Sequence, residues 1–291
     1  MKTAPFRYAR PESLDEALAL LAEHGDDAKI LAGGQSLLPV MALRLGRPEV
    51  VVDIGRIPGL ATLESGPDGT RIGALVKHRD VEFSDDIARW APMVAQAMPL
   101  IGHRAIRNRG TVVGSIAHAD ALGELLAVVL ATGATMVATS QGGEREIAAD
   151  DFLHGYFTTA LEPTEILTEV RFPAWRPNEG SSVKEFARRH NDYAVMGAAA
   201  RVVVDGGAIT EARLAYIGGA SSAVRVEAAE AVLVGATPGA DAFAEAATIV
   251  EAELDPEGDV HGTATYRRHL AGVLTKDCLA EACAAAEGSD S

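Results

Sequence analysis

The sequence contains only two cysteines among its 291 residues, Cys278 and Cys283, and both lie near the C-terminus. A disulfide-rich scaffold needs several pairs, and an iron–sulfur cluster of the usual kind needs four thiolate ligands. We therefore expect neither feature in this chain. The two thiols lie in an alanine-rich segment and are interpreted as ordinary core residues of a protein in a reducing compartment.

Basic residues are also scarce. The chain has 26 Lys and Arg against 41 Asp and Glu, which gives a net charge of −15. Proteins that bind nucleic acid or anionic lipid usually carry the opposite sign of charge. The sequence therefore predicts no nucleic-acid partner and favours small molecules and other proteins.

Long apolar runs are missing as well. No stretch of about eighteen uncharged apolar residues occurs, so no membrane-spanning helix is expected. The segment Met1–Pro5 lacks the apolar core of a signal peptide, and the predicted location is the cytoplasm.

Residues for direct catalysis are not grouped in any familiar pattern. No nucleophile stands with a credible base, and no second ligand stands at metal spacing from His118, so neither a catalytic side chain nor a metal site is predicted. His118 is expected to pack against a cofactor or in the core. The other seven histidines are scattered and are interpreted as structural or exposed.

What the sequence does contain is two glycine-rich loops about eighty residues apart. The first glycine loop, Ala32–Pro39, reads AGGQSLLP, and the second glycine loop, Gly110–Asp120, reads GTVVGSIAHAD. Small residues allow backbone N–H groups to crowd around a phosphate. Two such loops predict a ligand that is held by two subdomains at once, as a dinucleotide is, and FAD is the dinucleotide we expect.

Neither loop is a Rossmann G-x-G-x-x-G turn or a P-loop. A Gly-Gly turn alone is often purely structural, and this interpretation stays open for Gly33 and Gly34. Ser36 adds a hydroxyl to the first loop, and Lys29 adds a charge nearby. Asp120, at the end of the second loop, is suited to accept hydrogen bonds from sugar hydroxyls.

Three arginines, Arg104, Arg107 and Arg109, precede the second glycine loop. They form either a solvated surface turn, electrostatic support for a diphosphate, or a docking patch for an acidic partner. The sequence alone leaves these three interpretations open.

Hydrophobic patterning predicts an α+β chain with two domains. A strand at 29–32, a helix at 37–45 and a strand at 49–54 form a βαβ unit. Strands at 70–74, 135–139 and 166–172 then alternate with helices at 85–100 and 123–132, and a hinge follows at 173–182. Beyond it we expect a polar strand from about 184, a hairpin of strands 198–204 and 209–217, and helices within 221–234, 238–254 and 262–286.

These features are similar to the FAD-binding medium subunit of the molybdenum hydroxylases, the family of aerobic carbon monoxide dehydrogenase and the xanthine dehydrogenases. The resemblance runs from Phe6 to about Ala285 and is strongest in the two glycine loops, with further matches at 165–170 and 192–194. The chain departs from the family at two positions. Val113 stands where a Gly-Gly pair is common, and Ala121 stands where proline is expected.

The resemblance implies the architecture in more detail. An FAD-binding domain of the vanillyl-alcohol-oxidase (PCMH) type, residues 1–176, would consist of two subdomains, about 1–58 and 59–176. A smaller α+β C-terminal domain, 177–286, would contain a short antiparallel sheet and helices, and residues 287–291 would form a frayed tail.

The resemblance also implies the cofactor contacts. The first loop and residues 111–115 would hold the FAD diphosphate and ribityl chain, and Asp120 would hold ribityl hydroxyls. Leu161 and Leu167 would line the adenine or ring region, while Lys184 and Tyr193 would lie near the flavin ring. The complete predicted set is Lys29, Leu31, Ala32, Gly33, Gly34, Gln35, Ser36, Leu37, Ile101, Thr111, Val113, Gly114, Ser115, Ala117, His118, Asp120, Leu161, Leu167, Lys184 and Tyr193.

The implied function is electron transfer within a heterotrimer. In this family a large subunit with a molybdenum–pterin centre hydroxylates the substrate, and a small subunit carries two [2Fe–2S] clusters. This chain would pass electrons from its flavin to an acceptor such as a quinone or NAD. Two alternatives stay open at this point: a self-contained flavin-dependent oxidoreductase of the same fold, and a scaffold subunit without flavin.

Overall fold

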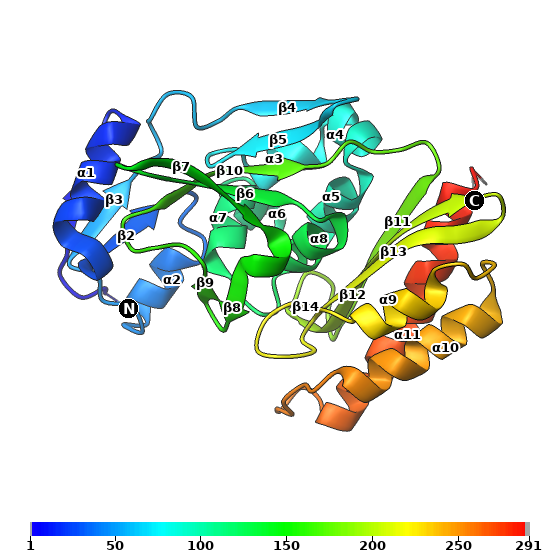
Figure 1. Cartoon of the computed structure of the whole chain (residues 1–291). Helices are drawn as coiled ribbons and strands as arrows, with labels where there is room; N and C mark the ends of the chain where they lie inside the picture. The colour runs from blue at the N-terminus through cyan, green and yellow to red at the C-terminus, as the bar shows by residue number, and fades with distance from the viewer. Residues whose placement is uncertain (1, 289–291) are drawn as a thin grey trace.

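The computed structural model describes residues 2–288 and begins with a small parallel sheet. Its strands lie in the order β1-β3-β2, with helices α1 and α2 and the short 3₁₀ helix η1 beside them (Figure 1). The bounds are β1 Arg7–Ala9, α1 Leu14–His24, η1 Gly25–Asp27, β2 Ala28–Leu31, α2 Leu37–Ala42 and β3 Val50–Asp53. Strands β2 and β3 pair in parallel, which confirms the predicted βαβ unit.

Helix α2 is shorter than predicted. It ends at Ala42 rather than at Leu45. Arg44 has φ 60°, a left-handed conformation that ends an α-helix, and nothing in the local hydrophobic pattern indicates it.

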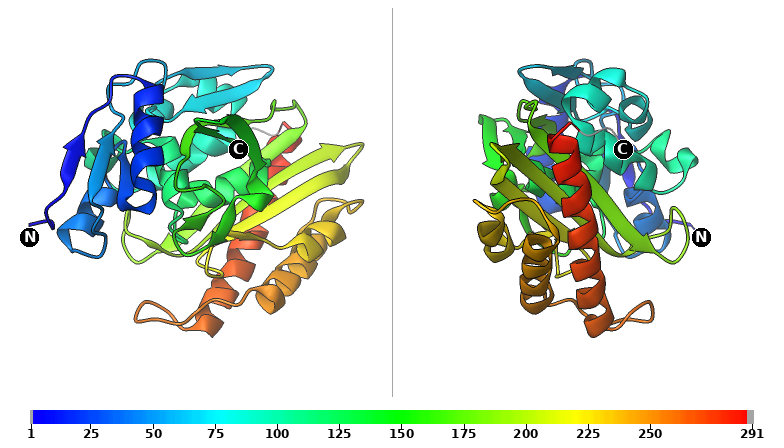
Figure 2. Two further views of the ribbon diagram at one scale, coloured as in Figure 1. Left: turned by 60° about the vertical axis from the view of Figure 1, so that its left-hand side comes forward. Right: turned by 90° about the vertical axis from the view of Figure 1, so that its right-hand side faces the viewer.

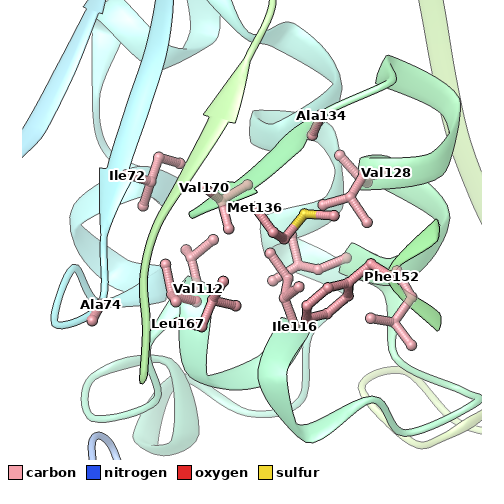
Figure 3. Packing of buried hydrophobic residues seen from close by; sticks show 14 of the residues in the cluster. Ile72, Ala74, Val112, Ile116, Val128, Ala134, Met136, Phe152, Leu167 and Val170 are labelled. Atoms are coloured by element: carbon pink, nitrogen blue, oxygen red, sulfur yellow. The ribbon is translucent and has the colours of Figure 1, made fainter. Parts of the chain in front are cut away.

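A five-stranded antiparallel sheet follows, in the order β4-β5-β10-β6-β7. Helices α3 to α8 accompany it, and Val112 and Ile116 of α7 pack against Leu167 and Val170 of β10 (Figure 3). The strands are β4 Leu63–Gly66, β5 Gly69–Gly73, β6 Thr135–Ser140, β7 Gly143–Ala148 and β10 Ile166–Phe172, with a separate hairpin of β8 Leu153–Gly155 and β9 Thr158–Thr159. The helices are α3 His78–Glu82, α4 Asp85–Trp90, α5 Pro92–Ala97, η2 Met98–Leu100, α6 Arg104–Arg107, α7 Val112–His118, α8 Glu124–Thr132 and η3 Ala149–Asp151.

The single helix predicted for residues 85–100 is wrong. The structure divides it into α4, α5 and η2, and Ala91 between α4 and α5 has φ −142° and ψ 57°. Proline disfavours the α conformation at the residue before it, so Pro92 breaks the helix at Ala91 and begins α5.

The C-terminal part contains the antiparallel sheet β11-β12-β13-β14 and three helices. Its strands are β11 Glu179–Ala187, β12 Ala194–Asp205, β13 Ala208–Ile217 and β14 Val224–Arg225, and its helices are α9 Glu227–Leu233, α10 Ala240–Glu253 and α11 Ala264–Ala286. The sheet lies between two layers: α11 runs along one face, and α8 packs on the other (Figures 1 and 2).

Two predictions in this part need correction. Strand β11 begins at Glu179, inside the stretch predicted as a hinge, because Glu179 is buried and pairs with Arg201. Helix α9 begins only at Glu227, because Val224 and Arg225 pair with β13 instead. The predicted tail, 287–291, lies outside the described residues from 289 onward.

Candidate functional site

The two glycine loops meet backbone to backbone. A Cβ atom on Gly33 would lie 2.4 Å from the carbonyl oxygen of Arg109 and 2.7 Å from the Cα of Gly110. A Cβ atom on Gly114 would lie 3.9 Å from the Cβ of Ala32. Gly33 is therefore required for the contact between the two subdomains, and the junction of the loops is the natural place for a ligand that contacts both.

The first glycine loop presents a row of unpaired amides. Within residues 2–288, the backbone N–H groups of Gly33, Gly34, Gln35, Ser36 and Leu37 donate no hydrogen bond. Gly34 has φ +73°, which turns the chain at the centre of the row. The Gln35 side chain donates to the Gly33 carbonyl at 3.2 Å and so braces the turn. Five successive free donors fit an anion such as a diphosphate.

The second glycine loop is more firmly packed. The Thr111 hydroxyl accepts from the N–H of Gly114, and the N–H of Val112 donates to Val76. Val113 is 2% exposed, so its side chain faces the core. The valine therefore does not block the outer side of the loop, and within the described residues its own N–H has no acceptor.

His78 contacts the second glycine loop through both its side chain and its backbone, a role that we did not predict. Its Nε2 lies 3.1 Å from the Ser115 hydroxyl, and its backbone N–H donates to Gly110. Burial, together with the nearby Arg107 charge, lowers the pKa of His78 to about 4. Residues 78 and 115 are far apart in sequence, so only the fold reveals this pair.

Two predicted residues, His118 and Asp120, lie at the C-terminal end of α7. Ala119 adopts the left-handed conformation, φ 52°, and turns the chain toward Asp120, whose Oδ1 accepts from the N–H of Leu122. The His118 ring lies 5.0 Å from that of Phe157, and burial lowers its pKa. Partial burial, followed by the charges of Asp120 and Glu124, raises the pKa of Tyr193, and the residue as a whole is 69% exposed.

Three further predicted residues are paired with another side chain or buried. Lys184 pairs with Glu281 of α11, at 2.6 Å between Nζ and Oε1. Its neighbour Glu185 instead approaches Glu124 of α8, so Lys184 is on the opposite face of the sheet from α8. Leu167 and Ile101 are buried in the core, at 4% and 8% exposure.

Four more of the predicted residues lie beside Gly34, at the surface or against the core. Leu31 lies next to Gly34, since a Cβ there would be 3.0 Å from its Cδ1. Lys29 is exposed, and Ala117 and Leu161 are half-buried against the core.

The idea that three arginines act together is wrong for Arg107. This side chain is 6% exposed, forms a bidentate pair with Glu82 and donates to the carbonyls of residues 101 and 102. It is a structural tie between α3 and α6. Arg104 and Arg109 are exposed.

A second unpredicted feature is a pair of acids at the contact between α8 and β11. Glu124 and Glu185 line one small cavity together with Ala127 and Ile217. Glu185 Oε2 is buried with no hydrogen-bond partner among the described residues. Burial raises the pKa of Glu185 to about 8 and that of Glu124 to about 7, and each value includes repulsion from a neighbouring carboxylate.

The metal-ligating side chains and the thiols of residues 2–288 form no cluster. Among residues 2–288 no group of three His, Cys, Asp or Glu could hold a metal ion. Both cysteines are buried, and burial raises the pKa of Cys278 to about 12 and that of Cys283 to about 11.

In residues 2–288, no helix is long and apolar enough to cross a membrane.

Comparison with known proteins assigns both parts of the chain. The family profile described as "FAD binding domain in molybdopterin dehydrogenase" matches residues 4–175, and "CO dehydrogenase flavoprotein C-terminal domain" matches 181–282. The chain is 42% identical to the 6-hydroxypseudooxynicotine dehydrogenase complex subunit alpha of Paenarthrobacter nicotinovorans, over 97% of this chain and 96% of that protein.

Two carbon monoxide dehydrogenase comparisons agree with this assignment. The chain is 36% identical to the carbon monoxide dehydrogenase medium chain of Hydrogenophaga pseudoflava, over 94% of this chain and 96% of the other. A solved carbon monoxide dehydrogenase structure from that organism superposes with a TM-score of 0.95 at 37% identity, covering 98% of this chain and 99% of its match.

Proposed function

The chain belongs to the FAD-binding subunits of the molybdopterin dehydrogenases, and from this premise we propose that it is the electron-transfer subunit of a three-part enzyme. It binds FAD and is an oxidoreductase component of the molybdenum hydroxylase type. In the proposed enzyme, electrons leave a molybdopterin-binding large subunit, cross [2Fe–2S] clusters on a small subunit and reach the flavin on this chain. From there they pass to an external acceptor such as a quinone or NAD.

The need for partners is supported by what this chain holds. Its two cysteines cannot supply the four thiolates of an iron–sulfur cluster, and both are buried. Its relatives are named as a subunit of a complex and as a medium chain. Substrate oxidation and the clusters are therefore assigned to other subunits.

The row of unpaired backbone amides at Gly33–Leu37 is the main observation that supports this location for the FAD site. In our proposal these donors hold the FAD diphosphate, with the Ser36 hydroxyl beside them and the second glycine loop opposite. Asp120 keeps one carboxylate oxygen for a ribityl hydroxyl, because the other accepts from Leu122. In our proposal the exposed side chain of Tyr193 contacts the flavin end of the cofactor.

Bound FAD supplies the ability to take electrons one at a time and release them as a pair. The protein's own part is to bind and orient. Neutral amides hold the diphosphate without adding a titratable group, and His118 and Phe157 pack together at the end of α7. Lys184, which we predict near the flavin ring, pairs with Glu281 of α11.

Substitution of Gly34 tests the site. Gly34→Asp places a carboxylate among the amides, whereas Gly34→Asn places a side chain of equal shape without the charge. Asparagine also tolerates the left-handed conformation at this position. Loss of two charge-assisted hydrogen bonds costs about 3–6 kcal/mol, which is more than a hundredfold in FAD affinity.

We expect Gly34→Asp to lose FAD and Gly34→Asn to bind it more weakly than the parent but far better than the aspartate variant, in a fluorescence titration. Gly207→Asp is the matched control, since it lies in the turn between β12 and β13 with no atom near its Cβ position. Equal affinity for the aspartate and asparagine variants would mean that no phosphate lies at this loop.

Partner subunits are tested by isolation of the chain, with an affinity tag, from cells that produce it naturally. The proposal predicts two further chains at equal stoichiometry, with molybdenum, iron and FAD in the purified complex. Turnover of an organic substrate by this chain alone with FAD would instead support a self-contained oxidoreductase.

A further inference from the structure

The His78 imidazole has one nitrogen with a partner and one without. Nε2 lies 3.1 Å from the Ser115 hydroxyl oxygen. Nδ1 is buried and has no hydrogen-bond partner among the described residues. The whole residue is 1% exposed.

The position of the proton on the neutral ring follows from this asymmetry. A neutral imidazole has one N–H donor and one acceptor nitrogen. A buried N–H without an acceptor is rarer in proteins than an incompletely used acceptor. The proton therefore belongs on Nε2, and Nδ1 keeps an unshared electron pair against the backbone of Gly110, where a Cβ would lie 3.0 Å away.

The charged groups around the ring agree with a neutral imidazole. Burial is the main cause that lowers the pKa of His78, and the Arg107 charge adds to it, while the backbone of Thr111 and the Glu82 charge act in the opposite direction. Arg107 and Glu82 are already paired with each other.

The consequence concerns the Ser115 hydroxyl. A serine hydroxyl can accept hydrogen bonds but donates only one. If His78 Nε2–H donates to Ser115 Oγ, the single hydroxyl proton of Ser115 is free to point elsewhere. With the proton on Nδ1 instead, Ser115 would have to donate to Nε2 and would offer a ligand nothing but lone pairs.

We propose that His78 is a positioning residue that fixes the Ser115 hydroxyl as a hydrogen-bond donor toward an anionic oxygen of the ligand held between the glycine loops. This inference rests on the proposed FAD site, where the anionic oxygens are those of the diphosphate. It adds one donor from the second glycine loop, whose backbone amides are largely occupied, to the row of amides in the first.

The direct test is the tautomer of His78 in the protein without FAD. Nitrogen-15 NMR of histidine-labelled protein distinguishes a protonated from an unprotonated ring nitrogen, and comparison with His78→Gln assigns the signals. We expect the proton on Nε2 at pH 7. A proton on Nδ1, or a doubly protonated ring, would overturn the inference, and this measurement does not depend on where FAD binds.

The second test measures FAD affinity in a mutant cycle. We expect Ser115→Ala and His78→Leu each to weaken binding by about ten- to a hundredfold, and the double variant to be no weaker than Ser115→Ala alone. His78→Gln should restore most of the affinity, because its amide N–H can occupy the place of Nε2–H. Independent losses that multiply in the double variant, or failure of glutamine to rescue a folded protein, would contradict the coupling.

Gly34→Asp separates the two proposals. If it abolishes FAD binding while Ser115→Ala has no effect, only the role of His78 and Ser115 fails. If neither substitution changes FAD affinity, the site between the glycine loops is itself misplaced.

Discussion

At the residue scale, His78, Glu124 and Glu185 make opposite contributions to the pH dependence of stability. Burial lowers the pKa of His78 to about 4, whereas burial raises that of Glu124 to about 7 and that of Glu185 to about 8. A histidine whose pKa is lower in the folded than in the unfolded chain makes the protein less stable as the pH falls. A carboxylic acid whose pKa is higher in the folded chain makes the protein less stable as the pH rises. His78 therefore reduces stability at acid pH, and the two glutamates reduce it at alkaline pH.

Glu185→Gln should stabilise the protein at alkaline pH. The pKa of the Glu185 carboxyl is near its ordinary 4.5 in the unfolded chain and about 8 in the folded one, so ionisation of Glu185 destabilises the fold between these limits. We expect the melting temperature of the variant to exceed that of the parent at pH 8.5 and to differ little at pH 4.5. The exposed Glu253→Gln is the control, and an equal shift at both pH values would show that Glu185 is not a buried acid.

His78→Gln should flatten the acid side of the stability curve. Between pH 6.5 and about 4 the unfolded chain takes up a proton that the folded imidazole refuses, so the parent loses stability as the pH falls through this window. The loss amounts to at most about 3 kcal/mol from this group. Urea unfolding at pH 7 and pH 4.5 would show it, and a variant as acid-sensitive as the parent would contradict a neutral His78.

The candidate site was predictable only where its residues are neighbours in sequence. The glycine loops carry their signal locally, in small residues that follow an apolar strand. His78 and Glu185 carry none, because their partners Ser115 and Glu124 come from distant elements. Leu167 is buried and Lys184 pairs with Glu281 because of which sheet faces are covered by helices. The local sequence does not indicate which face of a strand will be covered.

At the element scale, the fit of β11 against α11 depends on a glycine that the sequence analysis placed in a hinge. A Cβ on Gly180 would lie 1.9 Å from the carbonyl oxygen of Ala282. The backbone of the strand therefore touches the backbone of the helix. The same contact explains why strand β11 starts earlier than a hinge rich in proline and serine suggests.

Gly180→Ala should destabilise the protein by separating β11 from α11. Overpacking of this kind costs about 1–3 kcal/mol, and a contact with rigid backbone belongs at the upper end. Gly66→Ala, at a strand position with open space around it, is the control and should be nearly neutral. A thermal melt that does not distinguish the two variants would contradict the close contact.

Elements with a regular period and clear ends were predicted well, and interrupted ones were not. Strand β10 agrees with its predicted range, and the Gly-Gly turn places the hairpin of β12 and β13 correctly, although β12 begins at Ala194 rather than at residue 198. The helix predicted at 85–100 continued through Pro92 on its apolar pattern alone. Pro92 disfavours the α conformation at Ala91, so the helix ends there despite the apolar pattern.

At the scale of the whole molecule, the C-terminal sheet serves two cores. Ala199, Ala215 and Ile217 belong to the core of the FAD-binding part, whereas Ala198, Leu214 and Tyr216 belong to the core beneath α10 and α11. Arg213 adds a polar link: its Nε donates to the Leu130 carbonyl at 2.9 Å, and its Nη2 to Asp150. The boundary predicted at residue 176 thus separates two segments that share an apolar interface.

We therefore expect residues 177–291 to fold poorly when produced alone. Removal of residues 1–176 exposes the apolar face of the sheet, which favours aggregation and binding of a hydrophobic dye. The full chain should melt in a single transition, measured by calorimetry. A fragment that stays monomeric and melts as sharply as the full chain would show that the interface contributes little to stability.

The visible absorption spectrum of the purified chain, before and after incubation with FAD, shows whether the protein binds a flavin. Our account predicts a flavin spectrum with one FAD released per chain on denaturation, and no iron–sulfur absorbance from this chain alone. A colourless protein that takes up no FAD would contradict the account and reduce the two glycine loops to structural turns.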